Sequence, residues 1–314
     1  MREEPPSLEE SASNRKALMM RDRGYGWNDL ARRLPPALPE FLQKQRWFGG
    51  KAREIVLVHI ADIVPLADEK EWAAFFVVAR VDYAEGAAET YALPLELAST
   101  GRMTQLQSGN PAMPVLWLPG EANEEADALC DALWDPGFSL FLLKTIPRCA
   151  RFSGREGEIE AVRTLAFEGL AGPVEEEAAL QPTLMNREQS NTSIVFGHRL
   201  IMKFFRRLEE DVNPDVELGI FLTERCSFAH VPPLAGNIFY RRHGGKSVSA
   251  ALVQAFIQNQ GDAWRYTLSA LDQFFTEVLN SPHEAPGIPE HSLLSLAQAD
   301  PPQAAERRIG KYLD

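Results

Sequence analysis

A β-hairpin encoded in residues 194–203 restricts the choice of fold more than any other segment of the sequence. Two apolar runs flank the dipeptide Gly197-His198, and glycine at the first position of a two-residue loop suits a type II′ turn. With that turn, the register places Thr192 opposite Lys203. The hairpin therefore predicts an antiparallel sheet in which a lysine lies beside the polar loop that precedes the hairpin.

A capped helix is expected directly after this hairpin. Asn213 can accept backbone hydrogen bonds, the next residue is a proline that fits the first helical position, and an acid follows it. We expect the helix over residues 214–225. At about 100° per residue, the residues on its buried stripe are Leu218, Phe221 and Leu222. Glu217 falls at the edge of that stripe, where a carboxylate needs a partner.

The remaining β-rich and proline-rich segments predict an α+β fold. Three β-rich runs, 54–64, 72–83 and 89–97, follow a short helix over 39–45 and are typical of an antiparallel meander. A proline cluster over 111–119 ends this unit. The predicted divisions are a charged tail over residues 1–35, an α+β unit over 36–120, a lobe over 121–262 and the start of another lobe over 263–314.

Further elements are expected in the second half of the chain. An acidic helix is predicted over residues 121–134, and two strands over 238–242 and 247–258. Asp262 begins an amphipathic helix whose apolar residues recur at steps of three and four. Residues 303–314 begin another apolar helix face with no C-cap, so we expect that the sequence is a truncated chain.

Charge and cysteine content exclude several classes of protein. The formal net charge of −12 repels phosphate backbones and anionic lipids, so nucleic acid and membrane surfaces are poor partners. Three cysteines without close spacing argue against a disulfide framework or a four-cysteine zinc site. No apolar segment is long enough for an export signal or a membrane span. We therefore expect a cytoplasmic protein.

Common nucleotide, metal and hydrolase motifs fail on spacing. The Gly245-Lys246-Ser247 sequence has Tyr240 where a phosphate-binding P-loop needs its first glycine. Near Gly24, neither the later glycine of a dinucleotide fingerprint nor a preceding strand is present. The six histidines form no i, i+4 pair, and no G-x-S-x-G turn occurs. The sequence therefore lacks the common motifs for these sites, and any nucleotide site must be built from other residues.

A constellation of polar groups fits phosphoryl transfer. Residues 188–193 form a polar loop, Lys203 lies on the strand beside it, and Glu217 lies on the helix that follows. Phosphoryl transfer needs backbone donors around the phosphates, a cation on them, and a carboxylate that holds the cation. The alternative is that Lys203 is a solvated strand residue and Glu217 an exposed helix charge. The hairpin register and the helix position together favour the functional interpretation.

Five segments of the sequence resemble maltokinase. They are residues 45–51 (QRWFGGK), 188–193 (EQSNTS), 200–208 (LIMKFFRRL), 213–217 (NPDVE) and 259–264 (NQGDAW). The resemblance implies an aminoglycoside-phosphotransferase-like kinase fold, with a protein-kinase-like N-lobe behind an N-terminal cap. It also implies transfer of the ATP γ-phosphoryl group to the anomeric hydroxyl of maltose, with Mg2+, in α-glucan and trehalose metabolism. The same module occurs fused to trehalose synthase, so the resemblance implies association or fusion with that enzyme.

The resemblance also implies roles for individual residues. The loop residues Ser190, Asn191, Thr192 and Ser193 take the place of a kinase glycine-rich loop, Lys203 matches the strand lysine, and Glu217 its helix partner. The connector from Gln258 to Gly261 reads adenine through its backbone, and Asp262 reaches the ribose or caps the following helix. Trp47 and Phe48, in the cap signature, are expected in the cap core rather than at a ligand.

One departure from the family pattern limits what this chain is expected to do. No His-x-Asp catalytic loop and no Asp-Phe-Glu metal segment occurs in the sequence. The resemblance places both downstream of Asp314, so catalytic and metal residues are expected to lie outside this chain. Two alternatives remain: a non-catalytic kinase-fold interaction or regulatory module, and a kinase of the same fold with another sugar or an aminoglycoside as acceptor. We predict that the 314 residues alone bind ATP weakly at best and phosphorylate nothing.

Overall fold

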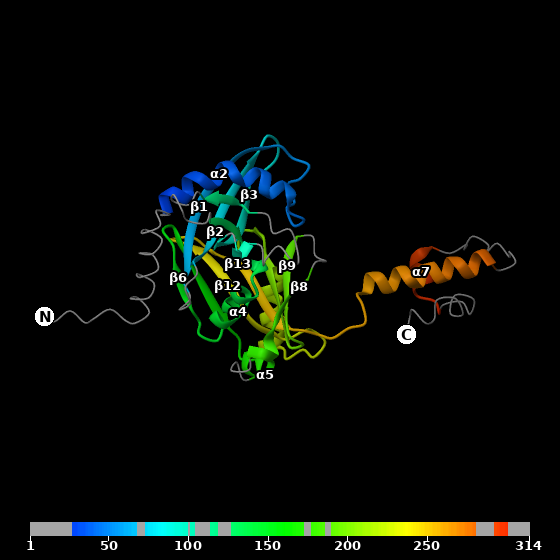
Figure 1. Ribbon diagram of the computed structural model, residues 1–314. Coiled ribbons are helices and arrows are strands. Elements are labelled where there is room, and N and C mark those ends of the chain that lie inside the picture. The colour runs from blue at the N-terminus through cyan, green and yellow to red at the C-terminus, as the bar shows by residue number, and fades with distance from the viewer. Residues whose placement is uncertain are drawn as a thin grey trace. The chain divides into compact units, whose positions relative to one another are not determined.

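The computed structural model describes residues 27–67, 73–99, 101–103, 114–118, 127–172, 177–185, 190–280 and 292–300. The chain divides into two units, Met1–Ile257 and Gln258–Asp314 (Figure 1). The first unit contains two antiparallel sheets joined by short helices. The predicted α+β class is therefore confirmed.

The first sheet has six strands. In order they are β1 (Ile55–Ala67), β2 (Ala73–Tyr83), β3 (Glu89–Ser99), β5 (Asp127–Asp131) and β4 (Leu116–Leu118), and β11 (Arg207–Leu208) pairs with β3. The expected meander corresponds to β1, β2 and β3. The helix expected over residues 121–134 is wrong within the described part, because residues 127–131 form β5 and Ala132–Trp134 form a 3-10 turn. This sheet continues beyond residue 120, and the division expected there stays a prediction.

The first sheet is covered on both faces, which explains the unbroken apolar run of β2. Phe75 and Val77 pack in one core with the helix α2 (Trp27–Lys44), which lies across the sheet in Figure 1. Phe76 and Val78 face the other core, which includes α4 (Pro136–Thr145) and the second sheet. Because both faces are buried, the strand has no polar alternation to show in its sequence.

Helix α2 is longer than the sequence predicts, and it begins inside the expected tail. It runs through Pro35, Pro36 and Pro39, where we expected punctuation before a helix over residues 39–45. The helix buries a stripe of apolar side chains, namely Leu30, Leu34, Leu38, Phe41 and Leu42. Each such side chain contributes about 1.5–3 kcal/mol on burial. The stripe therefore offsets the backbone hydrogen bonds that the prolines cannot make.

The second sheet has seven strands and carries the predicted hairpin. In order they are β6 (Arg151–Ser153), β7 (Gly157–Arg163), β12 (Leu234–Arg242), β13 (Ser247–Ala255), β10 (Leu200–Phe205), β9 (Asn191–Phe196) and β8 (Pro182–Met185). Its helices are α5 (Phe167–Ala171) and α6 (Pro214–Ile220), and α6 continues into a π-helical turn, Phe221–Arg225; a 3-10 turn, Glu177–Leu180, precedes β8. The Phe76 and Phe204 rings, 6.1 Å apart between centroids, bring the two sheets together.

The second unit contains α7 (Ala263–Asn280) and α8 (Leu293–Ala297). Helix α7 is the amphipathic helix expected after Asp262, and none of its residues is buried. The helix expected over 303–314 lies outside the described residues. In the described part of the chain, no helix combines the length and the apolar character needed to cross a bilayer.

Candidate nucleotide-phosphate site

The hairpin forms with a register one residue away from the prediction. Phe196 pairs with Leu200, so three residues rather than two make the turn, and Gly197 has a φ of 57°. Lys203 consequently faces Ser193, not Thr192. Because side chains alternate along a strand, this shift changes which residues share a face. Ser193 lies on the face of Lys203, whereas Thr192 lies on the opposite face.

Lys203 pairs with the first turn of α6. Its Nζ lies 3.5 Å from Asp215 Oδ2, and its side chain is 28% exposed. The expected ion pair between Lys203 and Glu217 does not form within the described structure: the carboxylate beside the lysine is that of Asp215, and Glu217 is exposed. Asn213 caps the helix by accepting from the Asp215 N–H at 2.9 Å, as predicted.

The buried face of α6 differs from the predicted stripe. Leu218 is 58% exposed and Phe221 is 52% exposed, whereas Val216 is fully buried. Val216 packs with Phe205, Leu234 and Leu252 of the second sheet, and Ile220, one turn later, packs against the same cluster. Since Val216 faces the sheet, the acids on either side of it, Asp215 and Glu217, point in different directions. This orientation gives the lysine a partner two residues earlier than expected.

The four predicted loop residues do not act as one loop. Ser190 precedes β9, and Asn191, Thr192 and Ser193 lie within the strand, while residues 186–189 lie outside the described residues. The Thr192 hydroxyl accepts a hydrogen bond from Arg206 Nε at 2.8 Å, away from Lys203. Ser193 Oγ is buried and has no hydrogen-bond partner within the described structure. Ser193 is therefore the hydroxyl best placed beside the lysine.

Asn237 is a polar residue on this sheet that the sequence analysis missed. It pairs with Leu252, which pairs with Lys203, so the three lie in one row across β12, β13 and β10. The side chain is 1% exposed, and neither amide atom has a hydrogen-bond partner in the described part of the chain. A buried amide without partners costs about 1–3 kcal/mol. Its only sequence signal is an asparagine inside an apolar strand, where this residue is disfavoured.

The other predicted nucleotide residues belong to the second unit. Gln258 is exposed, and Gly261, at a φ of 157°, donates its N–H to Asn259 Oδ1 at 3.2 Å. Asp262 Oδ1 accepts from the Arg265 N–H at 2.7 Å, which is the helix-capping role considered for it. The roles of these residues toward adenine and ribose stay predictions.

The QRWFGGK motif contributes its aromatic side chains to the hydrophobic core of the first unit. Trp47 is 8% exposed and Phe48 is 3% exposed, so both belong to the core as predicted. A Cβ on Gly50 would lie 2.4 Å from the Tyr83 hydroxyl oxygen, closer than atoms can approach. Phe48 also packs against Tyr91, with ring centroids 5.2 Å apart. Close packing against two tyrosines therefore explains the glycine and the aromatic residues of the motif.

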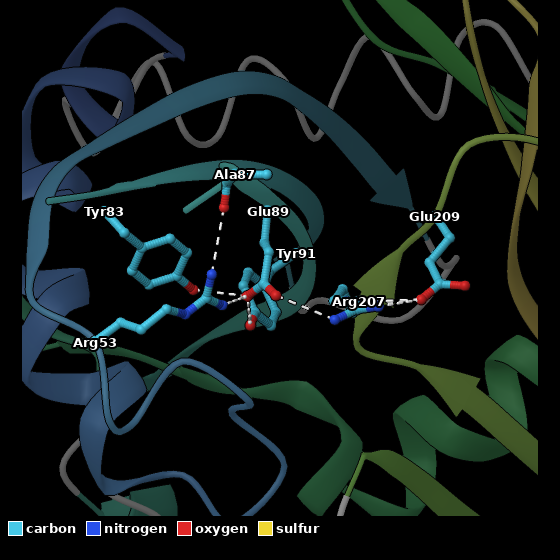
Figure 2. Close-up of polar contacts among 7 residues, drawn as sticks. All are labelled: Arg53, Tyr83, Ala87, Glu89, Tyr91, Arg207 and Glu209. Carbon is cyan, nitrogen blue, oxygen red and sulfur yellow. Dashed lines mark hydrogen bonds and ion pairs between the residues drawn. The ribbon is translucent and has the colours of Figure 1, made fainter. Parts of the chain in front are cut away.

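Glu89 organises the polar side of this packing (Figure 2). Its Oε2 accepts from the hydroxyls of Tyr83 at 2.7 Å and Tyr91 at 2.6 Å, and lies 2.6 Å from Arg53 Nη2. Arg207, on β11, pairs with the other carboxylate oxygen at 3.1 Å. Burial favours the neutral acid, but hydrogen bonds from both tyrosines and Arg53 hold the pKa of Glu89 below its ordinary value. Burial raises the pKa of Tyr83 to about 12.

The charged groups of the described residues do not form a metal centre. In the ranges that the structure describes, no three His, Cys, Asp or Glu side chains cluster closely enough to hold a metal ion. The polar groups around Lys203 instead offer one cation and one unpartnered hydroxyl, Ser193. A cation and free hydrogen-bond donors suit the phosphates of a nucleotide.

Comparison with known protein families finds a match in the first part of the chain. Residues 41–135 match the maltokinase N-terminal cap domain. Three solved glucosamine kinase structures resemble the chain at low identity. One, in complex with glucosamine, ADP and inorganic phosphate, is 15% identical, with a TM-score of 0.38 over 71% of this chain and 40% of that one. A second crystal form is 16% identical, with a TM-score of 0.41 over 81% of this chain and 45% of that one.

The chain spans less than half the length of these glucosamine kinases. The maltokinase match covers α2 from Phe41, all of β1 to β5, and the turn up to Asp135. The QRWFGGK motif, Glu89 and its partners Arg53, Tyr83 and Tyr91 lie within the match, whereas Arg207 lies outside it. The resemblance to maltokinase is thereby confirmed for the N-terminal cap, the region that the matched domain covers.

Proposed function

We propose that this chain supplies the ATP-binding portion of a maltokinase, which transfers the γ-phosphoryl group of ATP to the anomeric hydroxyl of maltose. The observation that carries the proposal is the site at Lys203: a strand lysine held by a helix carboxylate, beside an unpartnered buried hydroxyl. The maltokinase-type cap that precedes it supports the choice of enzyme class.

The order of strands supports a kinase-like use of Lys203. Strands β8, β9, β10, β13 and β12 are neighbours, and the chain passes from the lysine strand β10 into β11 and then helix α6. Protein kinases hold the ATP phosphates with a loop between two strands, a lysine on the next strand, and an acid on the following helix. Here β8 and β9 are the two strands, Lys203 lies on the next strand, β10, and the acid beside the lysine is Asp215.

In this proposal each group has a defined role. Lys203 contacts the α- and β-phosphates, Asp215 or Glu217 keeps the ammonium in place, and Ser190, Asn191 and Ser193 add polar contacts. Backbone and side-chain donors beside phosphate oxygens form short charge-assisted hydrogen bonds. Gln258, Gly261 and Asp262 are proposed to bind adenine and ribose. Mg2+ supplies charge neutralisation between the phosphates when bound.

The acceptor half of the reaction is proposed to need residues that this sequence lacks. An acceptor oxygen attacks the γ-phosphorus, the bond to the bridging oxygen of ADP breaks, and an aspartate accepts the hydroxyl proton. The resemblance places that aspartate and the Mg2+ carboxylates downstream of Asp314. We therefore propose that the 314 residues alone bind ATP weakly at best and do not phosphorylate maltose.

Nucleotide binding by a lysine variant and a matched control tests the proposal. Lys203→Met should abolish binding of a fluorescent ATP analogue, whereas Lys246→Met should not. Lys246 directly precedes β13 and also pairs with an acid, since its Nζ lies 2.7 Å from Asp211 Oδ1, but its side chain is 77% exposed. Equal binding by both variants would contradict the assignment of Lys203.

Turnover on a longer chain tests the acceptor. ADP production should require a sequence that continues through the downstream reading frame, and it should be faster with maltose than with glucose or glucosamine. Maltose-dependent ADP production by the 314-residue chain at the same rate would refute the placement of the catalytic aspartate.

A further inference from the structure

Arg206 lies where the chain passes from the second sheet to the first. It follows β10 and precedes β11, and its carbonyl oxygen accepts from the Ala92 N–H on β3 at 2.8 Å. The side chain is one of the largest fully buried side chains described. A guanidinium in such a position must find partners, because an unpaired buried charge is strongly unfavourable.

The guanidinium contacts both sheets. Its Nη2 donates to Asp131 Oδ2 at 2.6 Å, at the end of β5 in the first sheet. Its Nε donates to Thr192 Oγ1 at 2.8 Å, on β9 in the second sheet. Its carbon lies 4.7 Å from the centre of the Trp47 ring, in the cap motif. One side chain thus joins the cap to the strand that follows the proposed phosphate loop.

The contact between Arg206 and Thr192 lies on the face of the second sheet opposite the proposed site. Thr192 is the neighbour of Ser193, and it pairs with Phe204, the neighbour of Lys203. Fixing the Thr192 hydroxyl therefore fixes the backbone from which Ser193 projects to the other side. Arg206 itself is on the same segment as Lys203, three residues later. Through Arg206, the cap therefore contacts β9 and β10 on the face opposite Ser193 and Lys203.

The chemistry of the link favours a geometric role. Both ions are buried, with side chains 2% and 4% exposed, so they lose hydration that their attraction only partly returns. Well-packed apolar residues often replace such a pair without loss of stability. A planar guanidinium, however, sets direction as well as distance to its acceptors. Asp131 is itself oriented, since its Oδ1 accepts from the Leu133 N–H at 3.2 Å.

We propose that Arg206 is a positioning residue of the nucleotide site, through which Asp131 of the cap aligns β9 and β10 so that Ser193 and Lys203 meet the phosphates. This inference rests on the proposed function and adds a role for the cap in it. The cap then acts on nucleotide affinity without contacting the nucleotide.

A second buried link between the sheets provides a matched control. Asp62, on β1, is fully buried and accepts from the Tyr240 hydroxyl at 3.0 Å and from the N–H groups of Arg155 and Glu156 at 3.2 Å. These partners belong to the β6–β7 turn and to β12. Within the described residues, the hydrogen bonds of Asp62 involve neither β9 nor β10. Loss of this link should affect stability alone.

The test compares Asp131→Asn with Asp62→Asn in the same chain. Asp131→Asn should weaken binding of a fluorescent ATP analogue at least fivefold, whereas Asp62→Asn should leave it within twofold of the unchanged protein. Thermal unfolding is measured for both, and each is assayed well below its Tm. Equal affinities in the two variants, or an equal loss, would overturn the inference.

A nucleotide-free measurement separates this inference from the proposed function. The acylation rate of Lys203, relative to Lys246 in the same chain, is followed by mass spectrometry with an amine-acylating reagent. Asp131→Asn should raise this ratio at least threefold and Asp62→Asn should not. If the chain extended through the downstream reading frame binds no ATP analogue, the proposed function fails, and the acylation ratio still decides whether the cap positions Lys203.

Isosteric variants cover the case in which Asp131→Asn does not fold. Thr192→Val removes the hydroxyl that Arg206 uses, and Tyr240→Phe removes the hydroxyl that Asp62 uses. Only the first should raise the Lys203 acylation ratio, and Thr192→Ser should restore it. A rise with Tyr240→Phe, or none with Thr192→Val, would refute the positioning role.

Discussion

Replacing Glu96 by glutamine should make the protein more stable at neutral and alkaline pH. Glu96, on β3, is fully buried, and neither carboxylate oxygen has a hydrogen-bond partner among the described residues. The nearest cation is Arg102, whose Nη2 lies 3.9 Å from Oε2. Burial raises the pKa of Glu96 to about 7, with Asp131 adding to the shift and Arg102 opposing it.

The magnitude follows from the difference in proton binding. The ordinary pKa of 4.5 describes the unfolded chain, so the folded protein holds this proton more tightly between pH 4.5 and about 7. The stabilisation that this tighter proton binding gives the folded state is fully present below pH 4.5, and it is lost as the pH rises from 4.5 to about 7. At 1.36 kcal/mol per pH unit, the loss is about 3 kcal/mol. Glutamine is neutral at every pH and lacks this loss.

Urea unfolding followed by circular dichroism at pH 5 and pH 8 measures the effect. Glu96→Gln should raise the free energy of unfolding at pH 8 by up to about 3 kcal/mol and change it little at pH 5. Glu89→Gln is an opposite control: hydrogen bonds outweigh burial and lower the pKa of Glu89 below 4.5, so its contribution is present at both pH values and its replacement should destabilise at pH 5 as well as at pH 8. A Glu96→Gln variant that is less stable at pH 8 would refute the reasoning.

Three further changes test the packing and the site. Gly50→Ala should lower the free energy of unfolding by about 1–3 kcal/mol, since its Cβ would meet the Tyr83 hydroxyl at 2.4 Å; an unchanged urea midpoint would contradict this. Asp215→Asn should weaken binding of an ATP analogue more than Glu217→Gln does, because Asp215 is the acid beside Lys203. A larger loss of affinity in Glu217→Gln would instead favour the pairing of Lys203 with Glu217 that the sequence predicted. Asn237→Leu should raise the free energy of unfolding by about 1–3 kcal/mol by removing an unpartnered amide, and a lower urea midpoint would count against that assignment.

The sequence determined the features that depend on neighbouring residues. Asn213 and Pro214 start α6 where predicted, because capping and the fixed φ of proline act locally. Apolar runs located β1, β2 and β3, since buried strands need continuous or alternating apolar side chains. The residue types around Lys203 suggested a phosphate site, and residues 45–51 pointed to the cap that the domain match confirms.

Tertiary packing decided the features that depend on distant residues. The turn at Gly197 could close with two or three residues, and only pairing with the rest of the sheet selected the register that sets Ser193 against Lys203. The helical periodicity of α6 does not determine which of its faces packs on the sheet. Because Val216 is the buried residue, Asp215 rather than Glu217 lies beside Lys203. Arg206 gave no local signal, because its partners lie on separate strands. Burial energy is summed over whole faces, so it overrides small local preferences in all three places.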